Sequence, residues 1–361
     1  MQETGCWLME GTVVGERYQL GAVLGIGGYG ITYRGLDLRL ERQVAVKEYY
    51  PGFWANRLGD HHKEVYCYAE AEESYEKGLE RFLDEAKSLV ALSHIPEVVR
   101  VSDFFRENNT AYLVMDYLDG QNLKQMAQGF GGRIPAEVLI PVLEPLIKSF
   151  GKIHASGLIH RDLSPDNIMM LSDGSVRLID FGNARDVTNG KSMTLAMKQG
   201  FAAPEQYKSR GQGTWTDVYG ICATVYYCLT GKLPPQAMER LTGAPFPTPT
   251  ELGVDILPQW ESAIMDGLDL FVKSRIQTMD ELWERIYKEP DIADEELLSE
   301  QMTVVHTTDA TGNIQRDVTT IPTQQLTAKK YSSPERIQWL QERFLQMRAK
   351  CVEVFKRMKE K

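Results

Sequence analysis

The first third of the chain contains mostly short, largely apolar runs, whereas the part that follows has longer patterns with helical spacing. Residues 18–24 alternate loosely between apolar and polar, and residues 44–46 and 110–115 are largely apolar runs. Runs of this length predict β-strands. Residues 79–92 differ, because their apolar positions recur every three or four residues, which predicts a helix. This part is therefore expected to be mostly β-sheet with one helix.

The second part of the chain has longer helical patterns and one short strand pattern. Residues 138–154 form an amphipathic stretch with Pro141 and Pro145 near its start, where proline is tolerated better than in mid-helix. Another apolar helix is expected to begin within residues 215–220. Between these helices, the mostly apolar run of residues 176–179 predicts a short buried strand that leads into an acidic residue.

An aromatic and charged insert, residues 48–78, separates the strand pattern of residues 44–46 from the helix pattern that follows. The insert is longer than the usual connection between two elements. It could pack on the sheet or dock a partner, and we expect packing.

Two further segments follow the globular part of the chain. Residues 290–328 are first acidic and then polar and rich in threonine, a composition that predicts a flexible linker. A capping-box pattern from Ser332 to Glu335 and apolar positions with heptad spacing predict an amphipathic basic helix within residues 329–361. Three roles stay open for this helix: docking onto the preceding domain, which we favour, formation of a homodimer, or association with an acidic membrane surface.

The composition is that of an ordinary globular protein, since 43% of the 361 residues are hydrophobic and 25% are charged. The formal net charge of −10 argues against a protein that coats nucleic acid. The five cysteines are scattered without a C-x-x-C pair, so neither a disulfide framework nor a zinc site is expected. No secretory signal and no run of about 18 apolar residues is visible, which favours a soluble cytoplasmic protein.

Three polar residues near the short strand have the spacing of a metal-dependent site. Asp162 lies five residues before Asn167, and Asp180 lies thirteen residues after Asn167, at the end of the strand. Asn167 and Asp180 carry oxygen ligands of the hard type that Mg²⁺ prefers when it is shared with phosphates. Asp162 would then be free to orient a hydroxyl group or to accept its proton. The alternative is a pair of unrelated acidic turns.

A cluster of glycines indicates a phosphate-binding loop. It consists of Gly25, Gly27, Gly28 and Gly30. Neither a helix nor Gly-Lys-Ser/Thr follows, which argues against a dinucleotide fold and a Walker loop. The β-prone residues after Gly30 instead place the glycines at the tip of a hairpin, where backbone amides can approach phosphate oxygens without obstruction. An ordinary hairpin is the alternative, and Lys47 at the end of the next strand favours the phosphate site.

Taken together, these motifs resemble those of protein kinases. Residues 160–167 are similar to the kinase catalytic loop H-R-D-x-x-x-x-N, and residues 180–182 to the metal-binding motif D-F-G. Residues 44–47 are similar to V-A-I-K, and residues 203–205 read A-P-E. The resemblance covers roughly residues 14–287 and is strongest toward bacterial kinases of the eukaryotic-like serine/threonine class.

The resemblance implies an α+β fold of two lobes. A small β-rich amino-terminal lobe would cover residues 14–118 and a larger helical carboxy-terminal lobe residues 119–289, after an extension of residues 1–13. ATP and Mg²⁺ are the implied cofactors, and a protein with Ser or Thr hydroxyl groups is the implied substrate. Two other classes stay open. The retained motifs argue against a pseudokinase scaffold that acts through its tail, and the long segment closed by A-P-E argues against a small-molecule phosphotransferase.

The resemblance also implies roles for individual residues. The implied catalytic and metal-binding residues are Lys47, Glu85, Asp162, Asn167 and Asp180. The implied nucleotide contacts are Gly25, Gly27, Gly28, Gly30, Ala45, Lys47, Met115, Asp116, Leu118 and Met169. Glu85 is preferred over Glu80 and Asp84 because it lies about nine residues before a His-x-Pro-like turn. By the same resemblance, Asp217 holds the backbone of the catalytic loop, and Arg275 pairs with Glu205.

Two positions depart from the family pattern in complementary ways. Ser164 stands two residues after Asp162, where serine/threonine kinases usually carry a lysine. Lys198 stands where they usually carry a threonine. We hypothesise that Lys198 reaches back and places its ammonium where the missing lysine would be, which would make it a fourth catalytic residue beside Asp162, Lys47 and Glu85. A solvated loop lysine is the alternative.

Hydroxyl groups in two segments are candidates for phosphorylation. The first set lies between D-F-G and A-P-E and comprises Thr188, Ser192 and Thr194. The second set lies in the linker and comprises Thr303, Thr307, Thr308, Thr319, Thr320 and Thr323. The linker threonines are candidate autophosphorylation sites that a phosphothreonine-binding partner would recognise.

Overall fold

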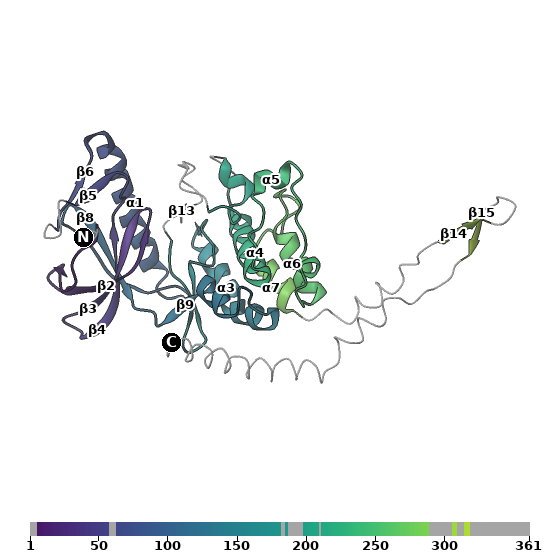
Figure 1. The fold of residues 1–361 in the computed structure, drawn as a ribbon, viewed down its shortest axis with the longest axis horizontal. Helices are drawn as coiled ribbons and strands as arrows, with labels where there is room; N and C mark the ends of the chain where they lie inside the picture. The colour runs from purple at the N-terminus through teal and green to yellow at the C-terminus, as the bar shows by residue number, and fades with distance from the viewer. Residues whose placement is uncertain are drawn as a thin grey trace.

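The computed structural model describes residues 6–57, 63–181, 198–208 and 211–288, and the backbone of residues 185–186, 305–308 and 314–317. Figure 1 shows strands gathered in the amino-terminal part of the chain and helices in the part that follows. The two-lobed α+β architecture expected from the sequence is therefore present.

An antiparallel six-stranded sheet forms the body of the amino-terminal lobe. Its order is β1-β2-β3-β4-β8-β7. Strand β8 lies between two others and is buried at every position except its last, which explains its continuous apolar run. The strands are β1 (Val13–Val14), β2 (Tyr18–Gly27), β3 (Gly30–Asp37), β4 (Arg42–Tyr49), β7 (Val101–Glu107) and β8 (Thr110–Asp116).

Helix α1 (Glu72–Ala91) packs against the sheet through one face. The buried side chains on that face recur every three or four residues and include Tyr75, Leu79, Phe82 and Leu89. The helix begins earlier than the apolar pattern of residues 79–92 predicted. Its first two turns are mostly polar and have Glu72 and Glu73 at the start, where negative charge favours a helix N-terminus, so an apolar count misses them.

The insert that follows β4 packs on the amino-terminal lobe, as expected. It contains β5 (Ala55–Arg57), β6 (Val65–Cys67) and the short helix η1 (Ala69–Ala71), and it merges into α1. Arg57 of β5 forms an ion pair with Glu48 of β4, and both side chains are almost completely buried. The hydroxyl groups of Tyr33 and Tyr112 also donate to this carboxylate, at 2.8 and 2.9 Å. One buried carboxylate thus connects the insert to three strands of the sheet.

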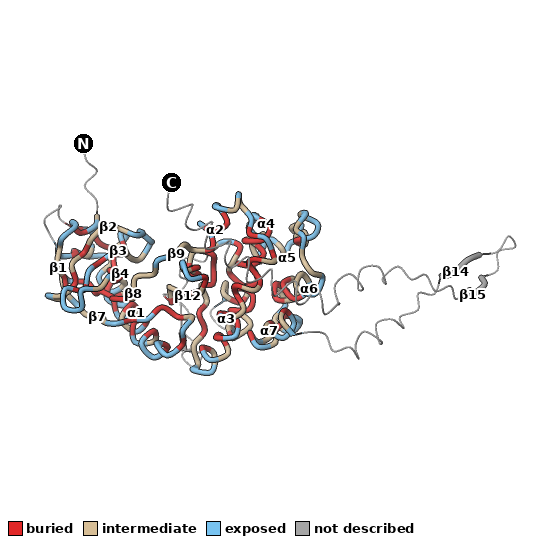
Figure 2. Tube along the Cα trace, turned by 90° about the horizontal axis from the view of Figure 1, so that it is seen from below, coloured by how far each residue is buried: buried red, intermediate tan, exposed pale blue. Residues whose placement is uncertain are grey.

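The carboxy-terminal lobe is built around helix α4, whose residues are nearly all buried. Helices α3 and α7 pack against each other and against α4, and Figure 2 shows buried segments concentrated along α3 and α4. Pro141 and Pro145 lie inside α3, which begins before the predicted stretch. The helices are α2 (Leu123–Gly129), α3 (Ala136–Ala155), α4 (Thr214–Thr230), α5 (Ala237–Leu241), α6 (Pro258–Gly267) and α7 (Met279–Tyr287), with short turns η3 (Pro204–Tyr207) and η4 (Thr250–Leu252).

Two small sheets carry the polar motifs at the start of this lobe. One has three strands in the order β12-β11-β9, and the other pairs β10 with β13. Their strands are β9 (Gly120–Asn122), β10 (Leu158–Ile159), β11 (Ile168–Leu171), β12 (Val176–Leu178) and β13 (Arg185–Asp186).

In the described part of the segment expected to be a linker, β14 (Val305–Thr308) and β15 (Ile314–Asp317) form an antiparallel pair. The helix expected within residues 329–361 lies outside the described residues, as do Thr188, Ser192 and Thr194. Within the described ranges, the four cysteines are free thiols, and no helix is long and apolar enough to cross a membrane.

Replacing Arg57 by methionine is expected to lower the free energy of unfolding by about 3–5 kcal/mol, because it leaves a buried carboxylate without its cation. Burial already raises the pKa of Glu48 in spite of its hydrogen-bond donors. Urea unfolding followed by circular dichroism measures the change.

The matched control is Lys77→Ala, which removes an exposed ion pair with Glu73 on α1 and should leave the urea midpoint unchanged. Adding Glu48→Gln to Arg57→Met should recover part of the loss. An Arg57→Met protein that unfolds at the wild-type urea concentration would contradict this account of the network.

Candidate active site

The ammonium of Lys47 lies between two carboxylates that come from distant parts of the chain. Strand β4 pairs with β3 and β8 on either side of this residue, at Thr32 and Leu113. The Nζ atom of Lys47 lies 3.0 Å from Asp180 Oδ1 and 3.5 Å from Glu85 Oε1. The sheet thus fixes the backbone of Lys47, and the two carboxylates hold its ammonium group in position.

Glu85 is the acid of α1 that faces the site, whereas Glu80 and Asp84 are exposed. Its carboxylate also accepts a hydrogen bond from the backbone N–H of Phe181, at 3.3 Å. Burial raises the pKa of Glu85 to about 7, and the Lys47 charge opposes that rise. Burial alone would lower the pKa of Lys47, but Asp180 and Glu85 outweigh it and raise that pKa.

Asn167 and Asp180 are brought together by the hairpin of β11 and β12. Ile168 is paired with Leu178, and the next backbone N–H, that of Ile179, donates to the Asn167 carbonyl at 3.0 Å. The strand is also bonded to the connection after α1, because the Leu178 N–H donates to the Glu97 carbonyl at 2.7 Å. Asp180 therefore follows closely after a strand that is attached to both lobes.

The catalytic loop holds Asp162 next to Asn167. The side-chain nitrogen of Asn167 donates to the Asp162 carbonyl at 2.8 Å and to its Oδ2 atom at 3.1 Å. Burial raises the pKa of Asp162, and the charge of Lys198 opposes the rise. Lys198 donates a hydrogen bond to the Ser164 hydroxyl at 2.8 Å, and its Nζ atom lies 3.6 Å from Asp162 Oδ1. The structure therefore brings together the two departures from the family pattern.

Asp217 of α4 holds the backbone of this loop. Its carboxylate accepts hydrogen bonds from the backbone N–H groups of His160 at 2.8 Å and Arg161 at 2.7 Å. Arg161 has a φ of 67°, a left-handed conformation that is unfavourable for a residue with a side chain. Burial acts against the charge of Asp217, but donors including His154 keep its pKa below the usual value. At the start of the same helix, the Thr216 hydroxyl accepts a hydrogen bond from the N–H of the N-cap residue Gly213, at 3.1 Å.

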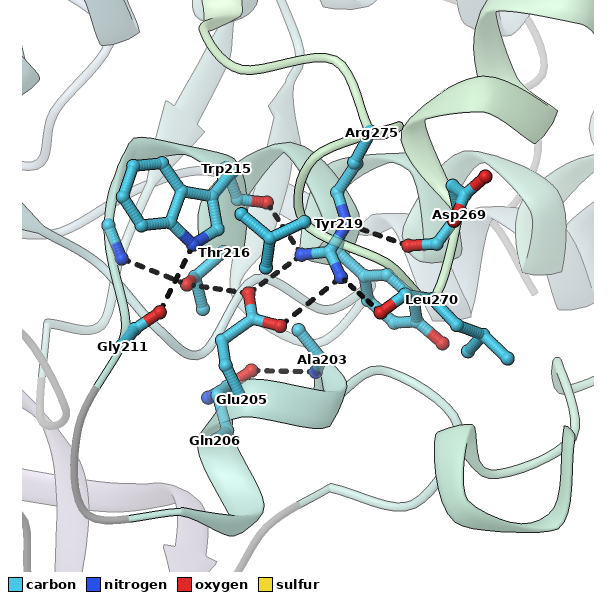
Figure 3. Close-up of polar contacts among 12 residues, drawn as sticks. Ala203, Glu205, Gln206, Gly211, Trp215, Thr216, Tyr219, Asp269, Leu270 and Arg275 are labelled. Atoms are coloured by element: carbon cyan, nitrogen blue, oxygen red, sulfur yellow. Dashed lines mark hydrogen bonds and ion pairs between the residues drawn. The ribbon is translucent and has the colours of Figure 1, made fainter. Parts of the chain in front are cut away.

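A buried ion pair joins the A-P-E segment to the body of the lobe, as Figure 3 shows. The guanidinium of Arg275 donates to both oxygens of Glu205, at 2.7 and 3.2 Å. The Thr216 hydroxyl donates to the same carboxylate at 2.9 Å, and Arg275 also donates to the Asp269 carbonyl at 2.8 Å. Two parallel hydrogen bonds between a guanidinium and a carboxylate allow only one relative orientation of the two groups. Together with the Thr216 hydrogen bond, this pair fixes η3 against α4.

Gln206 is a positioning residue that no physical pattern in the sequence predicted. Its side-chain nitrogen donates to the Arg161 carbonyl at 2.8 Å, and its side-chain oxygen accepts from the Ala203 N–H at 2.9 Å. It therefore connects the A-P-E segment directly to the catalytic loop. A lone glutamine beside a tyrosine carries no periodicity or charge pattern, so only the fold reveals this bridge.

The other expected nucleotide contacts lie on β4, at and just after the end of β8, and on β11. Ala45 of β4 is paired with Met115 of β8, and both residues are buried. Asp116, at the end of β8, forms an ion pair with Arg42 at 3.1 Å. Leu118 and Met169 are half-buried. Their contact with a nucleotide stays a prediction.

Comparisons with known proteins agree with this geometry. The sequence profile of the protein kinase domain matches residues 18–245. Serine/threonine-protein kinase PknL of Mycobacterium bovis is 32% identical over 229 residues, which are 63% of this chain and 52% of PknL. Serine/threonine-protein kinase PknB of Mycolicibacterium smegmatis is 29% identical over 283 residues, which are 74% of this chain and 42% of PknB. The chain thus spans about half the length of these curated relatives.

A solved structure titled "PpkA-294 apo form" matches with a TM-score of 0.69 and 31% identity, over 78% of this chain and 100% of that one. The two-lobed fold expected from the sequence is thereby confirmed. The chain belongs to the protein kinase family and is of the bacterial serine/threonine type.

Proposed function

We propose that this protein transfers the γ-phosphoryl group of Mg·ATP to Ser or Thr hydroxyl groups of proteins, itself included. The observation that carries the proposal is that carboxylate oxygens of Glu85 and Asp180 both lie within 3.5 Å of the Lys47 Nζ atom. Asp162 and Asn167 lie beside this cluster. Lys47 and Glu85 come from β4 and α1, Asp180 follows β12, and Asp162 and Asn167 belong to the catalytic loop. Their arrangement matches the parts that position a nucleotide in protein kinases.

The glycine-rich loop fits a phosphate group. A Cβ atom at Gly25 or Gly28 would meet nothing within 4 Å, so the packing of the chain does not require glycine at these positions. Bare backbone there leaves room for phosphate oxygens to approach the amides. Packing does require glycine at position 30, because a Cβ atom there would lie 2.6 Å from the Glu48 carbonyl oxygen. The apolar Ala45 and Met169 suit the faces of a flat adenine ring.

Asn167 and Asp180 fit a magnesium ion. Both offer oxygen atoms, and the Asn167 side-chain nitrogen is used by Asp162, which leaves the amide oxygen for the metal. Mg²⁺ binds through one or two such ligands together with substrate phosphates, and it would neutralise charge on those phosphates. Lys47, paired with Glu85, would bind the α- and β-phosphates.

Asp162 would receive the acceptor hydroxyl. In the reaction the bond between the γ-phosphorus and the bridging oxygen breaks, and its electron pair leaves with ADP. A new bond forms between the acceptor oxygen and the phosphorus, and the hydroxyl proton passes to the Asp162 carboxylate. The retained Lys47, Asp162, Asn167 and Asp180 argue against a pseudokinase scaffold, and the anchored A-P-E segment argues against a small-molecule substrate.

The insert contacts the tip of the glycine-rich loop. The Tyr50 N–H donates to the Tyr29 carbonyl at 3.0 Å. The ring of Tyr29 packs edge-on against Phe53 and Trp54, with centroids 5.2 and 6.1 Å apart. Because Tyr29 lies between Gly28 and Gly30, these contacts act on the part of the loop that would cover the phosphates.

Radiolabelled ATP incubated with the purified chain should label the chain itself or a general protein substrate. Asp180→Asn removes a metal ligand and Lys47→Ala removes the phosphate cation, so each should reduce labelling by about 10²-fold or more. Lys77→Ala, an exposed lysine on α1, serves as the control and should label as the wild type does. Equal labelling by the wild-type and Asp180→Asn proteins would overturn the proposal.

Phe53→Ala should raise the KM for ATP by about two- to tenfold and change kcat less, because an aromatic pair contributes about 0.5–1.5 kcal/mol. Phe53 is 52% exposed, so the substitution should not unfold the protein. Phe271→Ala, at a phenylalanine of the other lobe that is 67% exposed, is the control. Steady-state kinetics at varied ATP measures both constants, and an unchanged KM would show that the insert does not position the loop.

A further inference from the structure

Lys198 places a cation beside the catalytic aspartate. Its ammonium donates to Ser164 Oγ at 2.8 Å and lies 3.6 Å from Asp162 Oδ1. Ser164 is completely buried, whereas the Lys198 side chain is 33% exposed. The hydroxyl is therefore a fixed acceptor beneath the ammonium, and the charge itself lies at the edge of the site.

The backbone that carries Lys198 is held in a turn. The N–H groups of Phe201 and Ala202 both donate to the Lys198 carbonyl, at 3.1 and 3.2 Å. Gly200 has a φ of 82°, and a Cβ atom there would lie 2.8 Å from the Pro234 carbonyl. The turn therefore accepts only glycine at this position, and it determines where the lysine side chain starts.

The same segment is attached to the catalytic loop a few residues later. Gln206 donates to the Arg161 carbonyl at 2.8 Å, and Glu205 of the same turn is held by the buried Arg275. The cation and the carboxylate thus belong to two segments that share anchors. Their separation is a built feature of the fold and does not depend on one flexible side chain alone.

We propose that Lys198 is a catalytic residue, whose ammonium stabilises the phosphoryl group during transfer while Ser164 holds that ammonium in place. The inference rests on the proposed function and deepens it. As the bond to the ADP oxygen breaks and the bond to the acceptor oxygen forms, negative charge lies on the oxygens of the phosphoryl group near Asp162. A fixed cation at that point lowers the barrier, and Lys198 itself neither gains nor loses a proton.

A competing role for Lys198 is that of a latch. Its hydrogen bond to Ser164 could simply hold residues 198–208 against the catalytic loop. A latch needs a donor of the right length and no charge, whereas stabilisation of the phosphoryl group needs the charge. Lys198→Gln keeps a donor and removes the charge, and Lys198→Arg keeps the charge, so the two variants separate the roles.

The test uses the full chain and measures kcat and KM for phosphorylation of a general protein substrate. The dissociation constant of a fluorescent ATP analogue and the thermal unfolding midpoint are measured in parallel. Lys198→Gln should lower kcat by about 10²-fold or more, the loss typical of one removed charge-stabilising group. Lys198→Arg should retain most of the activity. Analogue affinity and unfolding midpoint should stay at wild-type values in both variants.

The more decisive part of the test moves the positive charge from residue 198 to residue 164. In Ser164→Lys combined with Lys198→Ala, a lysine stands on the catalytic loop itself and the space of the original ammonium is vacated. This protein should recover at least about a tenth of wild-type kcat, whereas Lys198→Ala alone should not. Lys208→Gln, at an exposed lysine of the same segment, is the matched control and should keep wild-type kinetics.

Three results would overturn the inference. They are wild-type kcat in Lys198→Gln, loss of kcat together with a lowered unfolding midpoint, and failure of the relocated lysine to restore activity. In each case an active wild-type chain would leave the proposed function standing. A wild-type chain that transfers no phosphate would contradict the proposed function and the inference with it.

Discussion

The structure of the site depends on the compensation of one charge, that of the Lys47 ammonium. Burial penalises this charge, and the two carboxylates that balance it come from α1 and from the end of the β12 segment. An uncompensated buried charge costs several kcal/mol, so sheet, helix and strand must meet at the same point. The two lobes are therefore linked by the same interaction that holds the Lys47 ammonium at the proposed phosphate site.

The polar residues of the candidate site could be picked out from the sequence because they belong to short motifs, and the structure brings Lys47, Glu85 and Asp180 together. Their catalytic and metal-binding roles stay predictions. The choice of Glu85 over its neighbours agrees with the contact to Lys47, since only Glu85 of the three lies on the buried face of α1. The start of that helix was not predictable from apolar spacing, because its first turns are polar. Contacts that involve residues outside the motif roles were out of reach, since the Arg57–Glu48 pair and the Gln206 bridge leave no periodic trace in the sequence.

Elements outside the motifs determine where the motifs stand. Arg57 and two tyrosines satisfy Glu48, which is the neighbour of Lys47 on β4, so the insert stabilises the strand that presents the lysine. On the other side, Asp217 holds the strained backbone at Arg161. The proposed role of Lys198 likewise depends on a second segment, because residues 198–208 must be folded against the catalytic loop to place the ammonium there. A lysine on the loop itself would carry no such dependence.

We propose above all that Lys47, Asn167, Asp180 and the glycine-rich loop surround one metal–nucleotide complex. A crystal structure of the full chain with Mn²⁺ and a non-hydrolysable ATP analogue tests this directly, because anomalous scattering locates the manganese. We expect manganese to be bound by the side-chain oxygens of Asn167 and Asp180, with Lys47 on the phosphates and the glycine-rich loop above them. Manganese bound away from Asp180, or phosphates out of reach of Lys47, would contradict this proposal.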